Sequence, residues 1–138
     1  MKHFPLLTLL LLFTTYTFAQ KPIPAPVSPC QKLDTGTIKN LIIGTWIDVK
    51  DSTHIITVTY DSVEETVVIQ VGGRTSRDKS YWNYRFTDNI FSTDAVTCYT
   101  LLEYLPDYPG KEKVAINYID SDYMLLGAEG KVVFKRKR

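Results

Sequence analysis

Residues 41–49 read LIIGTWIDV, and they form the first β-like run after an irregular leader. Gly44 and Trp46 are two residues apart, so in a strand both point to the same face. A large indole beside a residue without a side chain suits the closed end of a small barrel, where glycine lets a neighbouring group approach closely. An ordinary buried tryptophan in any antiparallel sheet is the alternative. Both interpretations predict a structural Trp46.

The composition bounds the class of protein. The chain has 138 residues, enough for one domain with a core and too few for two. Nine Tyr, six Phe and two Trp favour β structure, because aromatic rings fit a pleated surface. The formal net charge is +1, and four basic residues end the chain at positions 135–138. A net charge near zero, with the only basic run confined to the chain end, gives no basic surface for nucleic acid. No nucleic-acid partner is therefore expected.

Residues 1–19 have the three parts of a secretory signal peptide. Lys2 supplies the positive start, residues 6–13 the apolar centre, and Thr17-Phe18-Ala19 a small-x-small exit. The apolar run is too short to cross a hydrocarbon layer of ~30 Å, so no membrane span is expected. We predict cleavage near Ala19-Gln20 and a soluble protein that is secreted or periplasmic.

Residues 20–35 form a proline-rich segment. Prolines at positions 22, 24, 26 and 29 predict an extended chain, and an Asp34 or Thr35 cap predicts a short helical turn within residues 31–40. Cys30 and Cys98 are the two cysteines. In an oxidising compartment they predict a disulfide worth roughly 4 kcal/mol, with two free thiols as the alternative.

From residue 41 onward the hydrophobic period is close to two, as in strands. Short connections require antiparallel neighbours, and a sheet with one apolar face can bury that face by curling on itself. The prediction for residues 36–138 is an all-β, antiparallel, up-and-down meander barrel of about eight to nine strands, and a two-sheet sandwich is the alternative. A charged loop is expected at residues 74–79, a turn at residues 88–89 and a separate short strand at residues 90–92. The register of residues 96–104 cannot be assigned.

Three features together resemble the lipocalin-like proteins secreted by bacteria: LIIGTW at residues 41–46, a meander of short strands, and the closing YIDSDYMLLGAEGKVVFKRK at residues 118–137. Gly44-x-Trp46 looks like the calycin signature. The resemblance implies a lipocalin-like barrel in which a basic residue near the chain end covers Trp46, a role open to Lys135 or Arg136. The internal motifs of typical lipocalins are not recognisable, so no ligand class is implied.

Little in the chain has the pattern of catalytic chemistry. His54 is the only histidine after residue 19, and it shares a predicted inward face with Glu65, its expected partner. No cysteine–histidine cluster, phosphate-binding loop or nucleophile elbow occurs. Residues 120–122, Asp-Ser-Asp, are typical of a turn. We expect no enzyme, no metal and no cofactor.

A set of inward aromatic residues has the shape of a binding site. A barrel of about eight strands either holds one small ligand or is filled by its own side chains. We predict a monomeric, non-enzymatic carrier of a small apolar or amphipathic molecule. The alternative is a secreted protein inhibitor, for example of a protease, with a filled barrel and a projecting N-terminal segment, as the resemblance also implies. The inward aromatic set is Trp46, Tyr60, Trp82, Tyr84, Phe86 and Tyr118, and the candidate ligand-binding residues are Trp46, His54, Tyr60, Glu65, Val67, Trp82, Tyr84 and Tyr118.

Overall fold

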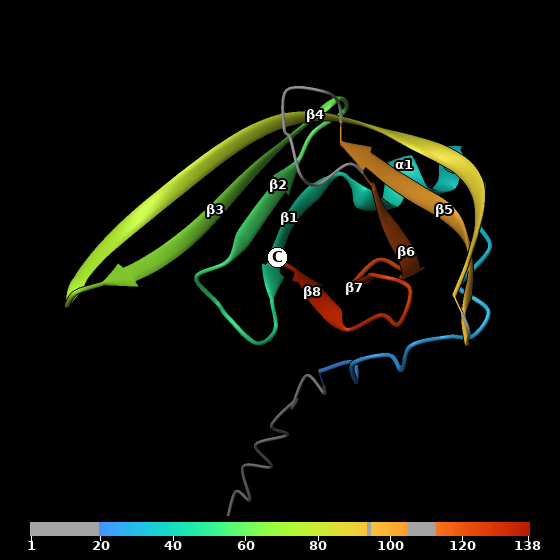
Figure 1. Cartoon of the computed structure of the whole chain (residues 1–138), viewed down its shortest axis with the longest axis horizontal. Coiled ribbons are helices and arrows are strands. Elements are labelled where there is room, and N and C mark those ends of the chain that lie inside the picture. The colour runs from blue at the N-terminus through green and yellow to red at the C-terminus, as the bar shows by residue number, and fades with distance from the viewer. Residues whose placement is uncertain (1–19, 94, 105–112) are drawn as a thin grey trace, which may run out of the picture.

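Eight strands form a closed barrel in which each strand pairs antiparallel with its neighbours in the sequence and the last pairs with the first (Figure 1). The computed structural model describes residues 20–93, 95–104 and 113–138, so the predicted signal peptide lies outside the described residues. The predicted up-and-down barrel is confirmed. In chain order the elements are α1 (Thr35–Ile42), β1 (Gly44–Asp48), β2 (Ile55–Val58), β3 (Ser62–Val71), β4 (Arg74–Ser92), β5 (Thr97–Tyr104), β6 (Lys113–Ile119), β7 (Tyr123–Leu126) and β8 (Val132–Arg136).

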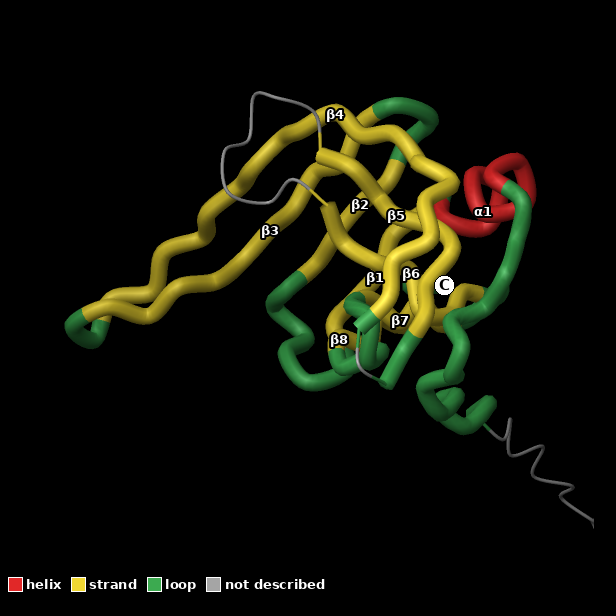
Figure 2. Tube along the Cα trace, turned by 45° about the vertical axis from the view of Figure 1, so that its right-hand side comes forward, coloured by secondary structure: helices red, strands yellow, loops and turns green. Residues whose placement is uncertain are grey.

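Helix α1 lies across one end of the barrel (Figures 1 and 2). The Asp34 carboxylate accepts a bond from the Thr37 backbone N–H at 2.9 Å, which confirms the predicted cap. Ile38 and Ile42 point into the core. The helix continues to Ile42, so the prediction that the strand begins at residue 41 is wrong. Within the described residues no helix is long and apolar enough to cross a bilayer.

Trp46 and Arg136 join the two ends of the barrel sheet to the helix. Trp46 is fully buried, and its indole N–H donates to the Ile42 carbonyl at 2.7 Å. The guanidinium of Arg136 lies 4.2 Å from the centre of the indole and donates to the Ile43 carbonyl at 2.7 Å and to the Leu41 carbonyl. These carbonyls end α1, so one arginine on β8 caps the helix and covers the tryptophan. Of the two candidates, Arg136 takes the covering role.

Gly44 is required where the arginine passes. Its φ is +137°, a conformation that side-chain-bearing residues rarely adopt, and a Cβ there would collide with the guanidinium of Arg136. The close approach expected at this glycine is confirmed, and the group that approaches is a side chain from the last strand.

Replacing Arg136 by alanine should lower the free energy of unfolding by about 3 kcal/mol, because hydrogen bonds from a charged donor and a covered indole are both lost. Urea unfolding of the purified protein measures the loss. The matched control is Arg138→Ala, since Arg138 is exposed and pairs with Asp122 at the surface. That change should cost less than about 1 kcal/mol. Equal losses for the two variants would contradict the assignment.

The proline-rich segment is tied along the outside of the barrel. The side-chain amide of Asn117 on β6 accepts from the Val27 N–H and donates to the Val27 carbonyl, both at 3.0 Å. Cys30 forms the predicted disulfide with Cys98 on β5. The Gln31 side chain accepts from the Ile119 N–H at 2.8 Å. The described part of the segment therefore lies against the wall and does not project from it.

Asn117 is also the site of a β-bulge. Ile116 pairs with Leu126 and Tyr118 with Leu125, so one extra residue interrupts the alternation of β6. After the bulge Ile119 is buried while Tyr118 is only half-buried and donates its hydroxyl to Asp120. The expectation that Tyr118 points into the barrel is therefore wrong.

The turn between β6 and β7 holds the start of the described chain. The Asp120 carboxylate accepts from the Lys21 ammonium at 2.5 Å and from the backbone N–H groups of Asp122 and Tyr123 at 2.8 Å. Burial raises the pKa of Asp120, but bonds from Lys21, these amides and the Tyr118 hydroxyl outweigh it and lower the pKa to about 2. The predicted turn role of residues 120–122 is confirmed.

Because the pKa of Asp120 is lower in the folded chain than its usual 3.8, its contribution is present above about pH 4 and is lost as the pH falls towards 2. The contribution is on the order of 2 kcal/mol. Asp120→Asn should remove this part of the acid sensitivity, measured as the unfolding free energy at several pH values. Asp61→Asn, in an exposed turn, is the control and should keep the wild-type slope. An unchanged slope for Asp120→Asn would refute the mechanism.

Strands β3 and β4 extend beyond the barrel as a two-stranded arm. Gly72 and Gly73, with φ of +57° and +77°, make a two-residue turn, and Val71 pairs directly with Arg74. The loop predicted at residues 74–79 is therefore wrong, because these residues pair with β3. Strand β4 then continues through an irregularity between Asp88 and Phe91, so the turn at residues 88–89 and the separate ninth strand are also wrong.

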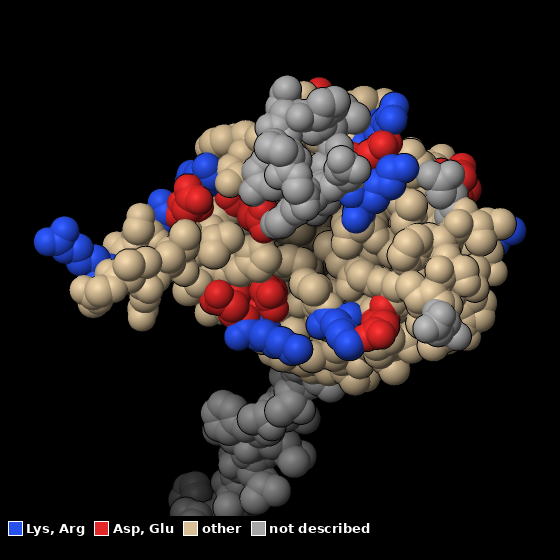
Figure 3. Space-filling model, viewed as in Figure 1, with Lys and Arg blue, Asp and Glu red and all other residues tan. Residues whose placement is uncertain are grey.

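The outer part of the arm, residues 69–79, is exposed on both faces. Figure 1 shows the arm leaving the ring of strands, and Figure 3 shows basic side chains at its far end. Over the barrel on the same view, acidic and basic side chains lie mixed. The arm adds little to the core, which lies between the ring of strands and α1.

Candidate functional site: the cavity inside the barrel

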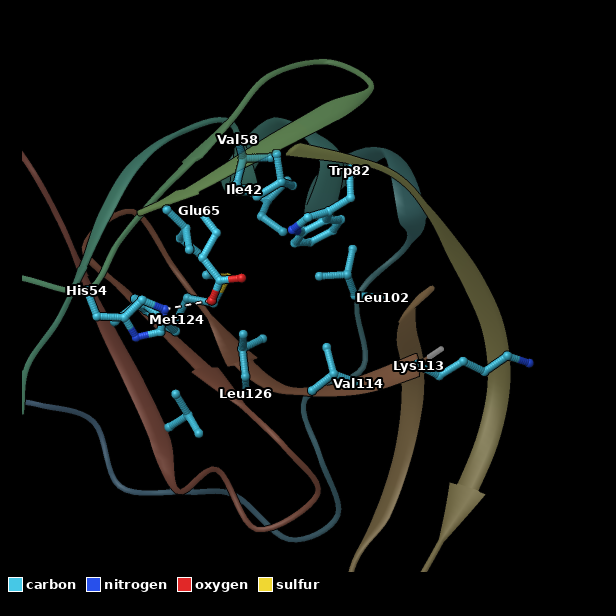
Figure 4. A pocket seen from close by; sticks show the side chains of 14 residues that line it. Ile42, His54, Val58, Glu65, Trp82, Leu102, Lys113, Val114, Met124 and Leu126 are labelled. Carbon is cyan, nitrogen blue, oxygen red and sulfur yellow. Dashed lines mark hydrogen bonds and ion pairs between the residues drawn. The ribbon is translucent and has the colours of Figure 1, made fainter. Parts of the chain in front are cut away.

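A cavity of about 420 Å³ lies inside the barrel (Figure 4). This volume falls within the ~300–1,000 Å³ of typical small-molecule sites. The wall is mainly aliphatic and aromatic, with a polar group formed by His54, just before β2, and Glu65 on β3. It is lined by Ile42, His54, Ile56, Val58, Val63, Glu65, Trp82, Leu102, Lys113, Val114, Met124, Leu126, Val132 and Phe134.

Strand register explains why these residues share one wall. Ile56 pairs with Glu65, and Val63 pairs with both Val58 and Trp82. Directly opposite residues in an antiparallel pair point to the same face, so the period of two in β2 and β3 continues into β4. The predicted inward alternation is confirmed for this part of the barrel.

The polar group is an imidazole held between two carboxylates. His54 Nε2 lies 2.8 Å from Glu65 Oε1, and His54 Nδ1 lies 3.3 Å from Asp48 Oδ2. The His54 ring also packs edge-on against Phe134 at 5.1 Å between centroids. The structure therefore brings His54 and Glu65 together as predicted.

Asp48 is the member of this group that sequence reasoning missed. It follows Trp46 by two residues in β1, so the same period that places Trp46 inward also indicates Asp48. Each ring nitrogen of His54 faces a carboxyl oxygen, and a ring nitrogen that carries a proton donates it to the carboxylate that it faces. With both carboxyls ionised, two negative charges meet at most one positive charge, and the group is net negative.

Lys113 contributes its alkyl chain to the cavity and turns its charge away. Figure 4 shows the ammonium pointing out of the cavity, and it lies 3.8 Å from the Glu103 carboxylate. A hydrogen bond from Arg85, with Lys113 nearby, lowers the pKa of Glu103, which stays ionised beside these cations. The lysine charge is therefore engaged on the outside of the barrel.

Three of the eight candidate residues line the cavity: His54, Glu65 and Trp82. Trp46 lies under the helix and Tyr84 is buried outside the lining, where its hydroxyl donates to the Thr59 carbonyl at 2.8 Å. Burial raises the pKa of the Tyr84 hydroxyl.

The other candidates lie elsewhere. Tyr60 is 70% exposed with the Lys39 ammonium 3.5 Å from its ring centre, so its inward placement is wrong, because β2 already ends at Val58. Val67 is half-buried at the base of the arm, and Tyr118 follows the bulge. Phe86 is half-buried against Tyr84. Neither Val67, Phe86 nor Tyr118 lines the cavity.

Several lining residues carry no usable signal in the sequence. All four residues of β7 are buried, so alternation cannot show that Met124 and Leu126 face the cavity. Leu102 lies in the segment whose register could not be assigned. Ile42 is the last residue of α1, at a position that was expected to be strand.

The described residues contain no group of three or more His, Cys, Asp or Glu side chains placed to hold a metal ion. The site is an apolar chamber with one polar group, which consists of two carboxyls and one imidazole. No protein-family model, curated protein or solved structure matches this chain.

His54→Phe should lower the free energy of unfolding by about 2 kcal/mol, because it removes the imidazole that lies within hydrogen-bond distance of both the Asp48 and the Glu65 carboxyls. Urea unfolding is the measurement. His54→Gln keeps a donor and should cost less than the phenylalanine variant. A phenylalanine variant as stable as the wild type would show that the imidazole does not hold the two carboxylates.

Proposed function

We propose that this chain is a secreted, lipocalin-like carrier that holds a small apolar or amphipathic molecule in the barrel cavity. The observation that carries the proposal is the cavity of about 420 Å³ with its apolar wall and one polar group. Binding sites for small molecules typically combine apolar walls with a few polar groups that orient the ligand. Burial of ligand surface there contributes roughly 25 cal/mol per Å².

Features outside the cavity support the same proposal. The Gly44, Trp46 and Arg136 arrangement agrees with what the resemblance to calycin-type lipocalins implies. The Cys30–Cys98 disulfide agrees with an oxidising, extracytoplasmic compartment. In this proposal the protein acts as a monomer, without a cofactor and without catalysing a reaction.

A second candidate is a secreted inhibitor or interaction module. That function calls for a projecting segment, and the exposed β3–β4 arm provides one. Against it, the described part of the proline-rich segment is tied to the wall by Asn117 and by the disulfide, and the barrel contains a cavity. We therefore favour the carrier.

Filling the cavity tests the carrier function. Val114→Trp places an indole in the cavity and should weaken uptake of a neutral fluorescent probe, N-phenyl-1-naphthylamine, at least tenfold, or ~1.4 kcal/mol. The melting temperature should stay within a few degrees, because the side chain enters empty space, whereas overpacking a filled core costs about 1–3 kcal/mol.

The matched control is Val71→Trp on the exposed end of the arm, which should leave probe uptake unchanged. If Val114→Trp binds the probe as well as the wild type does, the cavity is not the binding site. If Val71→Trp alone weakens capture of a protein target, the inhibitor function replaces the carrier.

A further inference from the structure

We propose that the cavity selects ligands whose polar end is a cation or hydrogen-bond donor, of which an alkyl amine is the simplest class, and rejects carboxylates with the same apolar body. This inference rests on the proposed carrier function and specifies the chemistry of its ligand. It follows from where the cavity places its charge.

The polar end of the cavity is an acceptor. Figure 4 shows the Glu65 carboxylate pointing into the cavity, with one oxygen on His54. Both ring nitrogens of His54 are directed at carboxylates, one to Glu65 and one to Asp48. The imidazole is therefore engaged by the protein, and neither of its ring nitrogens is directed at a ligand in the cavity.

The charged side chains of the described residues near the cavity also favour a cationic ligand over an anionic one. One imidazole lies between the two carboxyls of Asp48 and Glu65. When both carboxyls are ionised, their two negative charges exceed the single positive charge that the imidazole can carry, and the group is net negative. The ammonium of Lys113 pairs with Glu103 outside the wall, and the guanidinium of Arg136 is held over Trp46 by the helix carbonyls. Neither cation is placed to balance an anion brought beside Glu65.

The cost of desolvation makes the cavity select between cationic and anionic ligands. Moving a charged group from water into an apolar cavity is unfavourable unless an opposite charge and hydrogen bonds compensate it. An ammonium beside Glu65 meets a carboxylate, which has the opposite charge and accepts its hydrogen bonds. A carboxylate in the same position meets a like charge. A neutral alcohol donates a hydrogen bond without the charge and should rank between the two.

The test is competition for one neutral probe by three molecules with the same apolar body. Octylamine, octanol and octanoate are each titrated against the wild-type protein loaded with N-phenyl-1-naphthylamine at neutral pH. The expected order of affinity is octylamine, then octanol, then octanoate, with at least a tenfold difference between the amine and the acid. Added salt should narrow the difference, since it screens the charge of a partly exposed site.

A pair of neighbouring glutamates supplies the matched variants. Glu65→Gln removes the charge in the cavity, and the ratio of amine to acid affinity should fall at least fivefold. Glu64→Gln removes the same charge one residue earlier, where the side chain points outward and pairs with Lys79, and the ratio should stay within twofold of the wild type. Should Glu65→Gln fail to fold, Asp48→Asn is the second variant, and the wild-type ranking decides without either.

The outcomes separate the two proposals. If the probe binds and all three competitors displace it equally, or octanoate displaces it best, the ligand chemistry proposed here is wrong and the carrier function stands. The ligand chemistry is also wrong if Glu64→Gln and Glu65→Gln change the ratio alike. If neither the probe nor any competitor binds, the carrier function fails, and this inference fails with it.

Discussion

The contact of Arg136 with Trp46 and with the end of α1 is the interaction on which the rest of the structure depends. It joins the last strand to the helix and to the first strand, the places where a meander must meet itself to close. The arginine also donates to the Ser121 carbonyl at 2.7 Å, so the β6–β7 turn is tied to the same point. Gly44 follows from this constraint, because a side chain there would occupy the position of the guanidinium.

The end of the helix that meets Trp46 also borders the cavity. Ile42 belongs to the helix and lines the cavity, and the Trp46 indole N–H donates a hydrogen bond to the Ile42 carbonyl. The large indole of Trp46 therefore supports the helix and takes no space inside the chamber. A second tryptophan, Trp82, pairs with Val63 on the neighbouring strand and lines the chamber on the same wall as Glu65.

The barrel was predictable from the sequence where alternation is regular and one face is buried. The period of two in β2 and β3 located His54 and Glu65 on one wall, and the Gly-x-Trp pattern located the closed end. Prediction failed where a local feature changes the period. The bulge at Asn117 reversed the faces of Tyr118 and Ile119, and the two-glycine turn converted a charged loop into paired strand.

The other features that could not be predicted, the cavity-facing residues of β5 and β7 and the open barrel, depend on packing. Strand β7 is buried on both faces, and β5 is apolar on both, so their sequences contain no alternation that identifies the wall facing the cavity. Whether a barrel is open or filled depends on the summed volumes of side chains from all its strands and the helix. Such a sum is a property of the packed molecule, and no single segment of sequence expresses it.

Intermolecular nuclear Overhauser effects between a bound apolar probe and the methyl groups of the protein show whether the probe occupies the barrel cavity. Met124 and Leu102 line the cavity from different strands, whereas Ile69 is exposed on the arm. A probe inside the cavity should give contacts from its aromatic protons to the Met124 and Leu102 methyl groups and none to Ile69. Contacts to Ile69 alone, with the Met124 and Leu102 signals unchanged at saturating probe, would contradict it.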